Sequence, residues 1–146
     1  MIPFFSIAAV VYIFDFVTKH VVRERLPLGA EIHLLPFFSL VHVRNTGVAF
    51  GYFQGNNAAL LVVGLLMTFV LIYWGLQFCR QDRLSGFALA LVLGGALGNL
   101  TDRFLFRNVT DFLDFFVRSA HWPSFNVADS AICVGAAVLV WRHFRR

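Results

Sequence analysis

Four apolar segments, at residues 2–22, 58–78, 86–106 and 126–141, alternate with stretches that hold most of the charged residues. A helix needs roughly 17–25 apolar residues to cross the hydrocarbon core of a bilayer. Each segment approaches or reaches that length, and only 14% of all residues are charged. The sequence therefore predicts an all-α membrane protein with four transmembrane helices, in a single domain over residues 1–146.

The segment between the first two apolar stretches, residues 26–57, is interrupted by Pro and Gly. Within it, residues 38–53 read FSLVHVRNTGVAFGYF, which alternates and is rich in β-branched and aromatic side chains. This pattern predicts short strands, about 37–43 and 48–53, joined by a turn at Asn45–Gly47. Asn45 is interpreted as a turn residue, with a contact to a substrate backbone as the alternative. Because a free sheet edge leaves backbone groups unpaired, this small sheet must lie outside the hydrocarbon core. The segment between the third and fourth apolar stretches is interpreted as a loop.

The basic residues and the histidines limit the classes of function. The formal charge is +4, but the basic residues gather near helix ends, as expected at an anionic lipid surface, and do not form a stripe for nucleic acid. No histidine belongs to an HExxH motif and there is no GxSxG motif, so a zinc or serine peptidase is disfavoured, and we expect no metal and no cofactor. A dense basic cluster favours a cytoplasmic location for both termini, although the other side holds more basic residues over longer loops. This cluster is Arg80, Arg83, Arg142, Arg145 and Arg146.

Acidic side chains are costly in so apolar a chain, so their positions are candidate functional sites. Asp111 and Asp129 are predicted to form a catalytic pair at a membrane boundary. Two carboxylates held close together tend to share one proton, which provides a general base and a general acid at once. Asp114 competes with Asp129 for membership of the pair. Capping of the fourth helix, with Asn126 as its first residue, would by itself explain an acid at position 129.

Other polar residues lie at the ends of the apolar stretches. Asp15 and Lys19 are four residues apart and can pair on one helical face, either as a snorkelling pair at the lipid boundary or as part of a site. Asn99 and Arg103 share a face of the third segment. Asp102 lies between them and is interpreted as a local ion pair at the helix end.

Three classes of function are compatible with these residues. The first is a membrane aspartic peptidase that uses Asp111 and Asp129. The second is a proton-conducting subunit in which Asp15, Asp102 and Asp129 form a relay. The third is a structural protein whose glycines, such as those in the GxxxG spacing of residues 94–98, pack against another helix.

Five motifs follow one another over nearly the whole chain: Asp15-Phe-Val-Thr-Lys19, Asn45-Thr-Gly-Val-Ala-Phe50, Gly94-Gly-Ala-Leu-Gly-Asn99 with Asp102-Arg103, Val109-Thr-Asp111-Phe112, and Phe125-Asn-Val-Ala-Asp129-Ser130. In order and spacing they resemble the motifs of the lipoprotein signal peptidase (signal peptidase II) family. One departure is Thr110, where the family usually has an apolar residue.

The resemblance implies a bacterial inner-membrane aspartic peptidase with a small periplasmic sheet between the first two helices and an active site near the periplasmic face. Its substrate would be a diacylglyceryl-modified prolipoprotein within membrane lipids, cut just before the lipidated cysteine. The family's catalytic aspartates fall on Asp111 and Asp129. The residues that would support substrate or dyad are Asn45, Asn99, Arg103, Asn126, Asp15 and Lys19.

Overall fold

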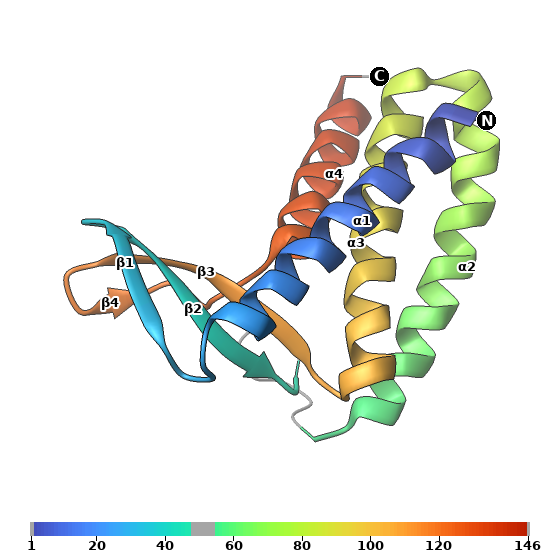
Figure 1. Cartoon of the computed structure of the whole chain (residues 1–146). Helices are drawn as coiled ribbons and strands as arrows, with labels where there is room; N and C mark the ends of the chain where they lie inside the picture. The colour runs from blue at the N-terminus through green and yellow to red at the C-terminus, as the bar shows by residue number, and fades with distance from the viewer. Residues whose placement is uncertain (1, 48–54, 146) are drawn as a thin grey trace.

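The computed structural model describes residues 2–47 and 55–145 (Figure 1). The helices in this part of the chain are α1 (Ile2–Arg25), α2 (Asn57–Gln81), α3 (Arg83–Phe106) and α4 (Val127–Phe144). The strands are β1 (Glu31–Leu35), β2 (Phe38–Asn45), β3 (Val109–Val117) and β4 (Ala120–His121). All four of these helices are long and apolar enough to cross a membrane. The predicted class, a four-helix membrane protein with a small sheet, is confirmed.

Helix α3 is the centre of the bundle, and α1, α2 and α4 each pack against it (Figure 1). Its buried side chains are mostly small, including Ala88, Ala90 and several glycines. Gly94 faces the backbone of α1 at Ala8, and Gly98 faces the Asp15 carboxylate on α1 and Ala128 on α4. Small residues let helix backbones approach closely. The packing role predicted for the GxxxG glycines is confirmed.

Replacing Gly94 by Ala is expected to lower the free energy of unfolding by about 1–3 kcal/mol, because the core is overpacked. A Cβ at this position would lie 2.6 Å from the backbone oxygen of Ala8, so a helix would have to move. The matched control is Gly64→Ala on α2, whose Cβ would meet only the end of the Leu100 side chain, at 2.9 Å. Unfolding in detergent micelles measures both variants. Equal stabilities would contradict the close approach of α1 and α3.

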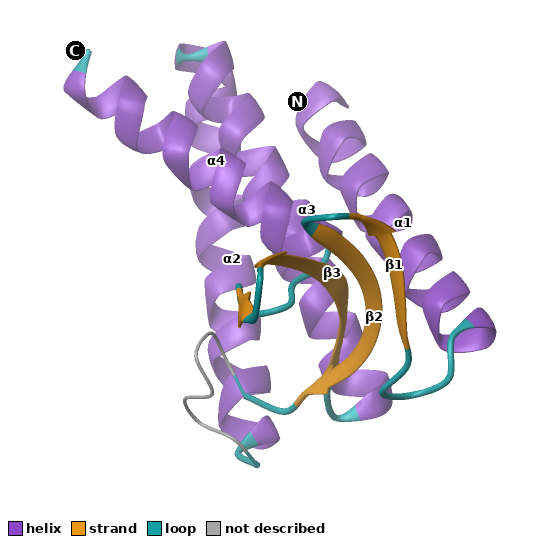
Figure 2. Cartoon of the chain, turned by 90° about the vertical axis from the view of Figure 1, so that its left-hand side faces the viewer, coloured by secondary structure: helices purple, strands orange, loops and turns teal. Residues whose placement is uncertain are grey.

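The sheet combines strands from two segments that are far apart in the sequence. Its order is β1-β2-β3-β4, and all neighbouring strands are antiparallel (Figure 2). The hairpin turn between β1 and β2 lies at residues 36–37, and β2 runs to Asn45. The predicted turn at Asn45–Gly47 would join β2 to the predicted strand at 48–53, which falls outside the described residues, so this turn stays a prediction. The interpretation of 107–125 as a loop is wrong, because this segment supplies β3, which pairs with β2 along the edge opposite β1.

The helices are longer than their apolar segments. Helix α1 continues to Arg25, α2 continues to Gln81, and α4 continues to Phe144. Helix α3 begins at Arg83 because the Asp82 side chain caps it, accepting from the backbone N–H of Leu84 at 3.1 Å. The number of consecutive apolar residues predicts only the part of a helix that lies in the hydrocarbon core. The helix itself continues into the polar interface until a cap ends its backbone hydrogen bonding.

Candidate active site

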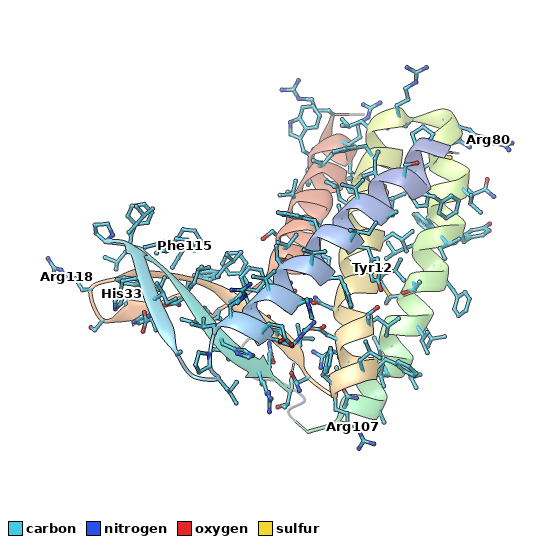
Figure 3. All side chains as sticks on the ribbon, viewed as in Figure 1. Tyr12, His33, Arg80, Arg107, Phe115 and Arg118 are labelled. Carbon is cyan, nitrogen blue, oxygen red and sulfur yellow. The ribbon has the colours of Figure 1, made fainter. Side chains whose placement is uncertain are left out.

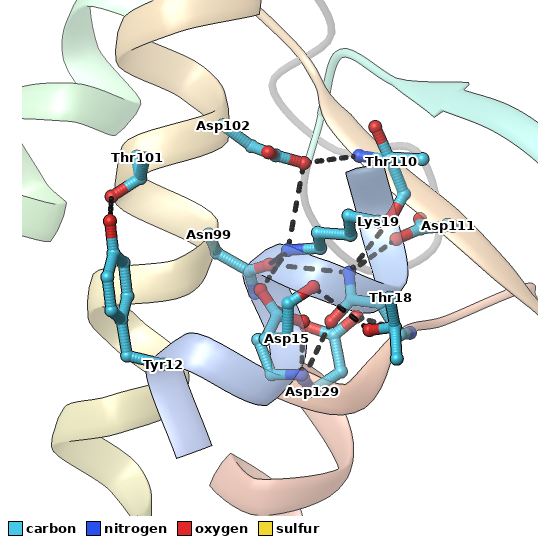
Figure 4. A network of polar contacts seen from close by, with 12 residues as sticks. Tyr12, Asp15, Thr18, Lys19, Asn99, Thr101, Asp102, Thr110, Asp111 and Asp129 are labelled. Carbon is cyan, nitrogen blue, oxygen red and sulfur yellow. Dashed lines mark hydrogen bonds and ion pairs between the residues drawn. The ribbon is translucent and has the colours of Figure 1, made fainter. Parts of the chain in front are cut away.

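The structure brings Asp111 and Asp129 together at one cavity. Asp111 is on β3 and Asp129 is in the first turn of α4, and both line a cavity of about 1170 Å³. Asn126 links them: its side-chain Nδ2 donates to Asp111 Oδ1 at 2.7 Å, and its backbone N–H donates to Asp129 Oδ2 at 3.2 Å. Figure 4 shows both carboxylates within one polar network. Two acids that are 18 positions apart in the sequence are therefore both hydrogen-bonded to Asn126, one by its side-chain amide and the other by its backbone N–H.

Asp111 is only 2% exposed, and side-chain amides hydrogen-bond both of its carboxylate oxygens. Asn45 Nδ2 donates to its Oδ2 at 3.0 Å, opposite the contact from Asn126. Burial raises the pKa of Asp111 to about 7, and the negative charge of Asp129 adds to the rise. The two amide donors and the Lys19 ammonium oppose this rise. Asp111 is therefore a carboxyl group that can hold or release a proton near neutral pH.

Asp129 is fixed by the start of α4. Asn126 is the N-cap, and its Oδ1 accepts from the Asp129 backbone N–H at 2.9 Å, while the Asp129 carboxylate accepts from the Asn126 N–H. This reciprocal capping box satisfies two helix-end donors. Asn99 Nδ2 on α3 donates to Asp129 Oδ1 at 2.8 Å. The predicted cap at Asn126 is confirmed, and the capping acid is also the one that faces the cavity.

Arg103 brings a guanidinium to the same cavity. It is 8% exposed, and its Nη2 donates to the carbonyl oxygen of Gly47, just after β2. Its Nη1 is buried and has no hydrogen-bond partner among the residues that the structure describes. A buried charged donor without a partner is costly. Arg103 Nη1 therefore remains available to an oxygen acceptor that is not among the described residues.

Asp15 and Lys19 form a buried ion pair on α1 that also contacts α3 and α4. Both are 0% exposed, and Lys19 Nζ lies 2.7 Å from Asp15 Oδ2. The other Asp15 oxygen accepts from the Ala128 backbone N–H in α4 at 2.8 Å. Lys19 also donates to Asn99 Oδ1 at 2.9 Å. The pair therefore lies inside the bundle, and its interpretation as a snorkelling pair at the lipid boundary is wrong.

Asp102 joins three elements, which its interpretation as a local ion pair missed. Its Oδ1 accepts from Arg23 of α1 at 3.0 Å, and its Oδ2 accepts from the Thr110 backbone N–H at the start of β3 at 2.9 Å. Lys19 Nζ is 3.7 Å from the same Oδ2. Thr110 Oγ1 also accepts from Arg23, at 3.0 Å. Sequence reasoning did not select Arg23, although it continues the four-residue spacing of Asp15 and Lys19 along one face of α1.

Asp114, the alternative partner for Asp111, lies elsewhere. It is 4% exposed, and its Oδ2 is 2.8 Å from His121 Nδ1. It is not among the described residues that line the cavity. Over residues 2–47 and 55–145, no group of three or more His, Cys, Asp or Glu side chains is arranged to hold a metal ion.

Comparison with known proteins adds an independent observation to this geometry. The model of the family described as Signal peptidase (SPase) II matches residues 7–145. The chain belongs to the signal peptidase II family. It is 43% identical over 148 residues to the lipoprotein signal peptidase of Burkholderia thailandensis (strain ATCC 700388), covering 99% of this chain and 89% of that protein. It is 38% identical to the lipoprotein signal peptidase of Alteromonas mediterranea, covering 97% and 80%.

Two solved structures match almost the whole chain. Both are described as bacterial membrane enzyme structures obtained by the in meso method, at 2.3 Å and 1.9 Å resolution. The first has a TM-score of 0.87 and 29% identity, covering 98% of this chain and 88% of that one. The second has a TM-score of 0.83 and 30% identity, covering 96% and 91%. The chain is therefore a multi-pass membrane protease, which favours the peptidase interpretation over the proton relay and the packing protein.

The raised pKa of Asp111 gives an expected pH dependence of stability. Because its folded-state pKa of about 7 lies above the ordinary value of 3.8, the folded protein retains a proton that the unfolded chain releases. The free energy of unfolding should therefore fall by about 1.4 kcal/mol per pH unit between these two values, and level off above pH 7. Thermal unfolding in detergent from pH 4.5 to 8 measures this slope. Asp111→Asn should flatten it, whereas exposed Glu24→Gln should not. An unchanged slope in Asp111→Asn would assign the pH dependence to other groups.

Proposed function

We propose that the protein removes signal peptides from diacylglyceryl-modified prolipoproteins and cuts just before the lipidated cysteine. The observation that carries this proposal is that two carboxylates, from β3 and α4, line one cavity and are both hydrogen-bonded to Asn126, through its side-chain amide and its backbone N–H. The names of the relatives, lipoprotein signal peptidases, support the substrate class.

The proposed mechanism uses Asp111 and Asp129 as a dyad that shares one proton. The ionised carboxylate takes a proton from a water molecule, whose oxygen attacks the scissile carbonyl carbon. The protonated carboxyl donates to the carbonyl oxygen, giving a tetrahedral intermediate. The newly ionised carboxylate then takes a proton from a hydroxyl of the intermediate, the C–N bond breaks, and the nitrogen leaves with the proton of the other carboxyl group, so the dyad again holds one proton. Because the two groups titrate together, the base and acid roles belong to the pair and not to either residue.

The polar groups around the dyad suit a peptide backbone. Arg103 lines the cavity, and its buried Nη1 has no partner within residues 2–47 and 55–145, so a substrate carbonyl could accept from it. Asn45 lies at the end of β2 and donates to Asp111, which positions the carboxylate beside an extended peptide. Asn99, which lines the cavity, donates to Asp129, and the fully buried Asn126 donates to Asp111. These four residues are proposed as supporting groups, together with Asp15 and Lys19.

Much of the rest of the cavity is apolar, as the lipidated end of such a substrate requires. Three helices supply a large part of this apolar lining: Leu60, Val63 and Met67 of α2, Ala96 and Leu100 of α3, and Ile132 of α4. Burial of acyl methylenes against such side chains is worth about 0.8 kcal/mol for each CH₂ group. A substrate that carries diacylglycerol would therefore bind far better than its unlipidated form.

We propose that the termini face the cytoplasm and the dyad lies near the periplasmic face. Both termini and the α2–α3 turn lie at one end of the bundle, and the sheet projects from the other part (Figure 1). Figure 3 shows Arg80 at the end that holds the termini, and His33 and Arg118 on the sheet. Of the basic residues outside the terminal end, Lys19 and Arg23 are engaged in ion pairs with Asp15 and Asp102. Fewer unpaired basic residues therefore oppose this orientation than the sequence count suggests.

The test is cleavage of a purified prolipoprotein with and without its diacylglyceryl group. Incubation in detergent should yield a fragment that begins at the lipidated cysteine, identified by mass spectrometry, from the lipidated precursor only. The Burkholderia thailandensis relative, run on the same substrate preparation, is the positive control. If the relative cuts the lipidated precursor and this protein does not, the proposed substrate is wrong. Equal cleavage of both precursors would contradict recognition of the lipid.

A further inference from the structure

Three asparagine side chains surround the two carboxylates, and the direction in which each amide points decides its effect. An amide has a donating NH₂ end and an accepting carbonyl end of nearly the same shape. The NH₂ end attracts a carboxylate and the carbonyl end repels it. Whatever fixes the orientation of these amides therefore controls the charge that the dyad can carry.

Asn45 and Asn126 are each oriented by a backbone N–H. The Gly47 N–H donates to Asn45 Oδ1 at 3.0 Å, and the Asp129 N–H donates to Asn126 Oδ1 at 2.9 Å. A backbone N–H cannot accept a hydrogen bond, so it holds the carbonyl end. The NH₂ ends of both amides must then point away from it, toward Asp111 at 3.0 and 2.7 Å.

Asn99 differs because a side chain holds its carbonyl end. Lys19 Nζ donates to Asn99 Oδ1 at 2.9 Å, and Asn126 Nδ2 makes a longer contact with the same oxygen, at 3.3 Å. An ammonium group has three donors and no acceptor, so a reversed Asn99 would place two donors against each other. With the carbonyl end held, Asn99 Nδ2 donates to Asp129 Oδ1 at 2.8 Å.

The ammonium is itself held in place. Asp15 Oδ2 at 2.7 Å and Asp102 Oδ2 at 3.7 Å surround it, and Lys19 is 0% exposed. Lys19 touches neither Asp111 nor Asp129 in any hydrogen bond or ion pair of the described residues, and it is not among the residues that line the cavity. Figure 4 shows Lys19 among Asp15, Asn99 and Asp102.

We propose that Lys19 is a positioning residue for the dyad: its ammonium locks the Asn99 amide so that the NH₂ end faces Asp129. The inference rests on the proposed function, since it concerns the same carboxylates. A locked donor stabilises the dyad in the form that has lost one proton, which is the form that activates water. Without the ammonium, only the longer contact from Asn126 Nδ2, at 3.3 Å, opposes a turn of the Asn99 carbonyl toward Asp129. When that carbonyl faces Asp129, the dyad keeps its second proton to higher pH.

Charged groups from several elements surround the dyad, and each of them affects the pH at which the dyad loses a proton. They are Asp15, Lys19 and Arg23 of α1, Arg44 of β2, and Asp102 and Arg103 of α3. Removal of the Lys19 charge would by itself disfavour an ionised dyad. A test of the lock must therefore separate the orientation of Asn99 from this direct effect of charge.

The main test variant must leave the net charge of the protein unchanged. Lys19→Met alone does not, because it leaves the Asp15 carboxylate buried without its ion-pair partner, and it is expected to lower the yield of folded protein. The double variant Asp15→Asn/Lys19→Met removes both charges, and Asp102 keeps Arg23 at 3.0 Å. Asp15→Asn alone is the matched control, because it retains the ammonium on Asn99 and an oxygen for the Ala128 N–H.

The measurement is kcat/KM for the lipidated precursor as a function of pH. The double variant should lose about 10- to 100-fold in kcat/KM, and the acidic limb of its profile should move up by about one pH unit. Asp15→Asn alone keeps the ammonium on Asn99 and removes a nearby negative charge, so its acidic limb should not move above the wild-type position. If the acidic limb of the double variant also stays at or below the wild-type position, the positioning role is wrong even though wild-type cleavage still supports the proposed function. No cleavage by the wild-type protein overturns the function itself.

An Asn99→Ala background then separates orientation from charge. With no amide to lock, adding Asp15→Asn/Lys19→Met should shift the acidic limb no further. A shift as large as that seen in the presence of Asn99 would show that the charges act directly on the dyad, and would overturn the positioning role. This double-mutant comparison isolates the coupling between Lys19 and Asn99.

Discussion

Asp111→Asn and Asp129→Asn are each expected to lower cleavage of the lipidated precursor by at least about 10³-fold, because neither variant can hold a shared proton between two carboxyl groups. Asn has nearly the same shape as Asp, so both variants keep the packing around the site, although the new NH₂ group of Asp111→Asn faces a donor from Asn45 or Asn126. Both variants should insert and unfold as cooperatively as the wild-type protein. The measurement is the initial rate of signal-peptide release, with thermal unfolding in the same detergent.

The matched control is Asp114→Asn. Asp114 lies on the same strand as Asp111 and is also buried, but it contacts His121 instead of the cavity. Its activity should stay within a few-fold of the wild-type value. Retained cleavage in Asp111→Asn or Asp129→Asn would remove that residue from the mechanism. A loss in Asp114→Asn as large as in the other two would mean that the assay reports damage to β3 and not chemistry.

Asp102→Ala is expected to have the largest effect on stability, lowering the free energy of unfolding by about 3–5 kcal/mol, because it breaks a buried ion pair by removing one partner. The Asp102 side chain is 1% exposed and accepts from Arg23 and from the Thr110 backbone N–H, at 3.0 and 2.9 Å. Its loss leaves Arg23 without its carboxylate and the start of β3 without its anchor. Chemical unfolding in mixed micelles measures the loss.

The control for Asp102→Ala is Glu24→Ala, which removes the same charge from an exposed position on α1. Its effect should stay within about 0.5 kcal/mol, as is usual for surface substitutions. Because Thr110 immediately precedes Asp111, Asp102→Ala should also lower activity in the protein that remains folded. Equal stability of the two variants would show that Asp102 does not hold α1, α3 and β3 together.

The sequence predicted the helices well and the sheet poorly. Lengths of apolar sequence are a local property, so the four spans could be counted without knowledge of their packing. Strand β3 could not be recognised in this way, because its partner β2 lies more than sixty positions earlier and its charged residues, Asp111 and Asp114, are buried by tertiary contacts. The turn predicted at Asn45–Gly47 begins where β2 ends, and it stays a prediction.

The candidate site shows the same division. A cap at Asn126 with Asp129 three residues later is a local pattern, and the structure has it. The ion pair of Asp15 and Lys19 was also predicted, since four-residue spacing places two side chains on one helical face. Its burial was not predicted, because a spacing does not say whether that face meets lipid or another helix. Asp102 was assigned to the nearest charge in the sequence, whereas its partners are on α1 and β3.

The four membrane-crossing helices, the residues that carry charge in so apolar a chain and, through the motifs, the family could all be predicted without a fold. Helix length, capping and residue type act within a few positions of the chain. The contacts between charges from different segments could not be predicted in this way: β3 lies beside β2, Asn126 links Asp111 to Asp129, and Lys19 donates to Asn99. Buried polar groups must find partners, and in a helical bundle those partners come from whichever elements pack nearby.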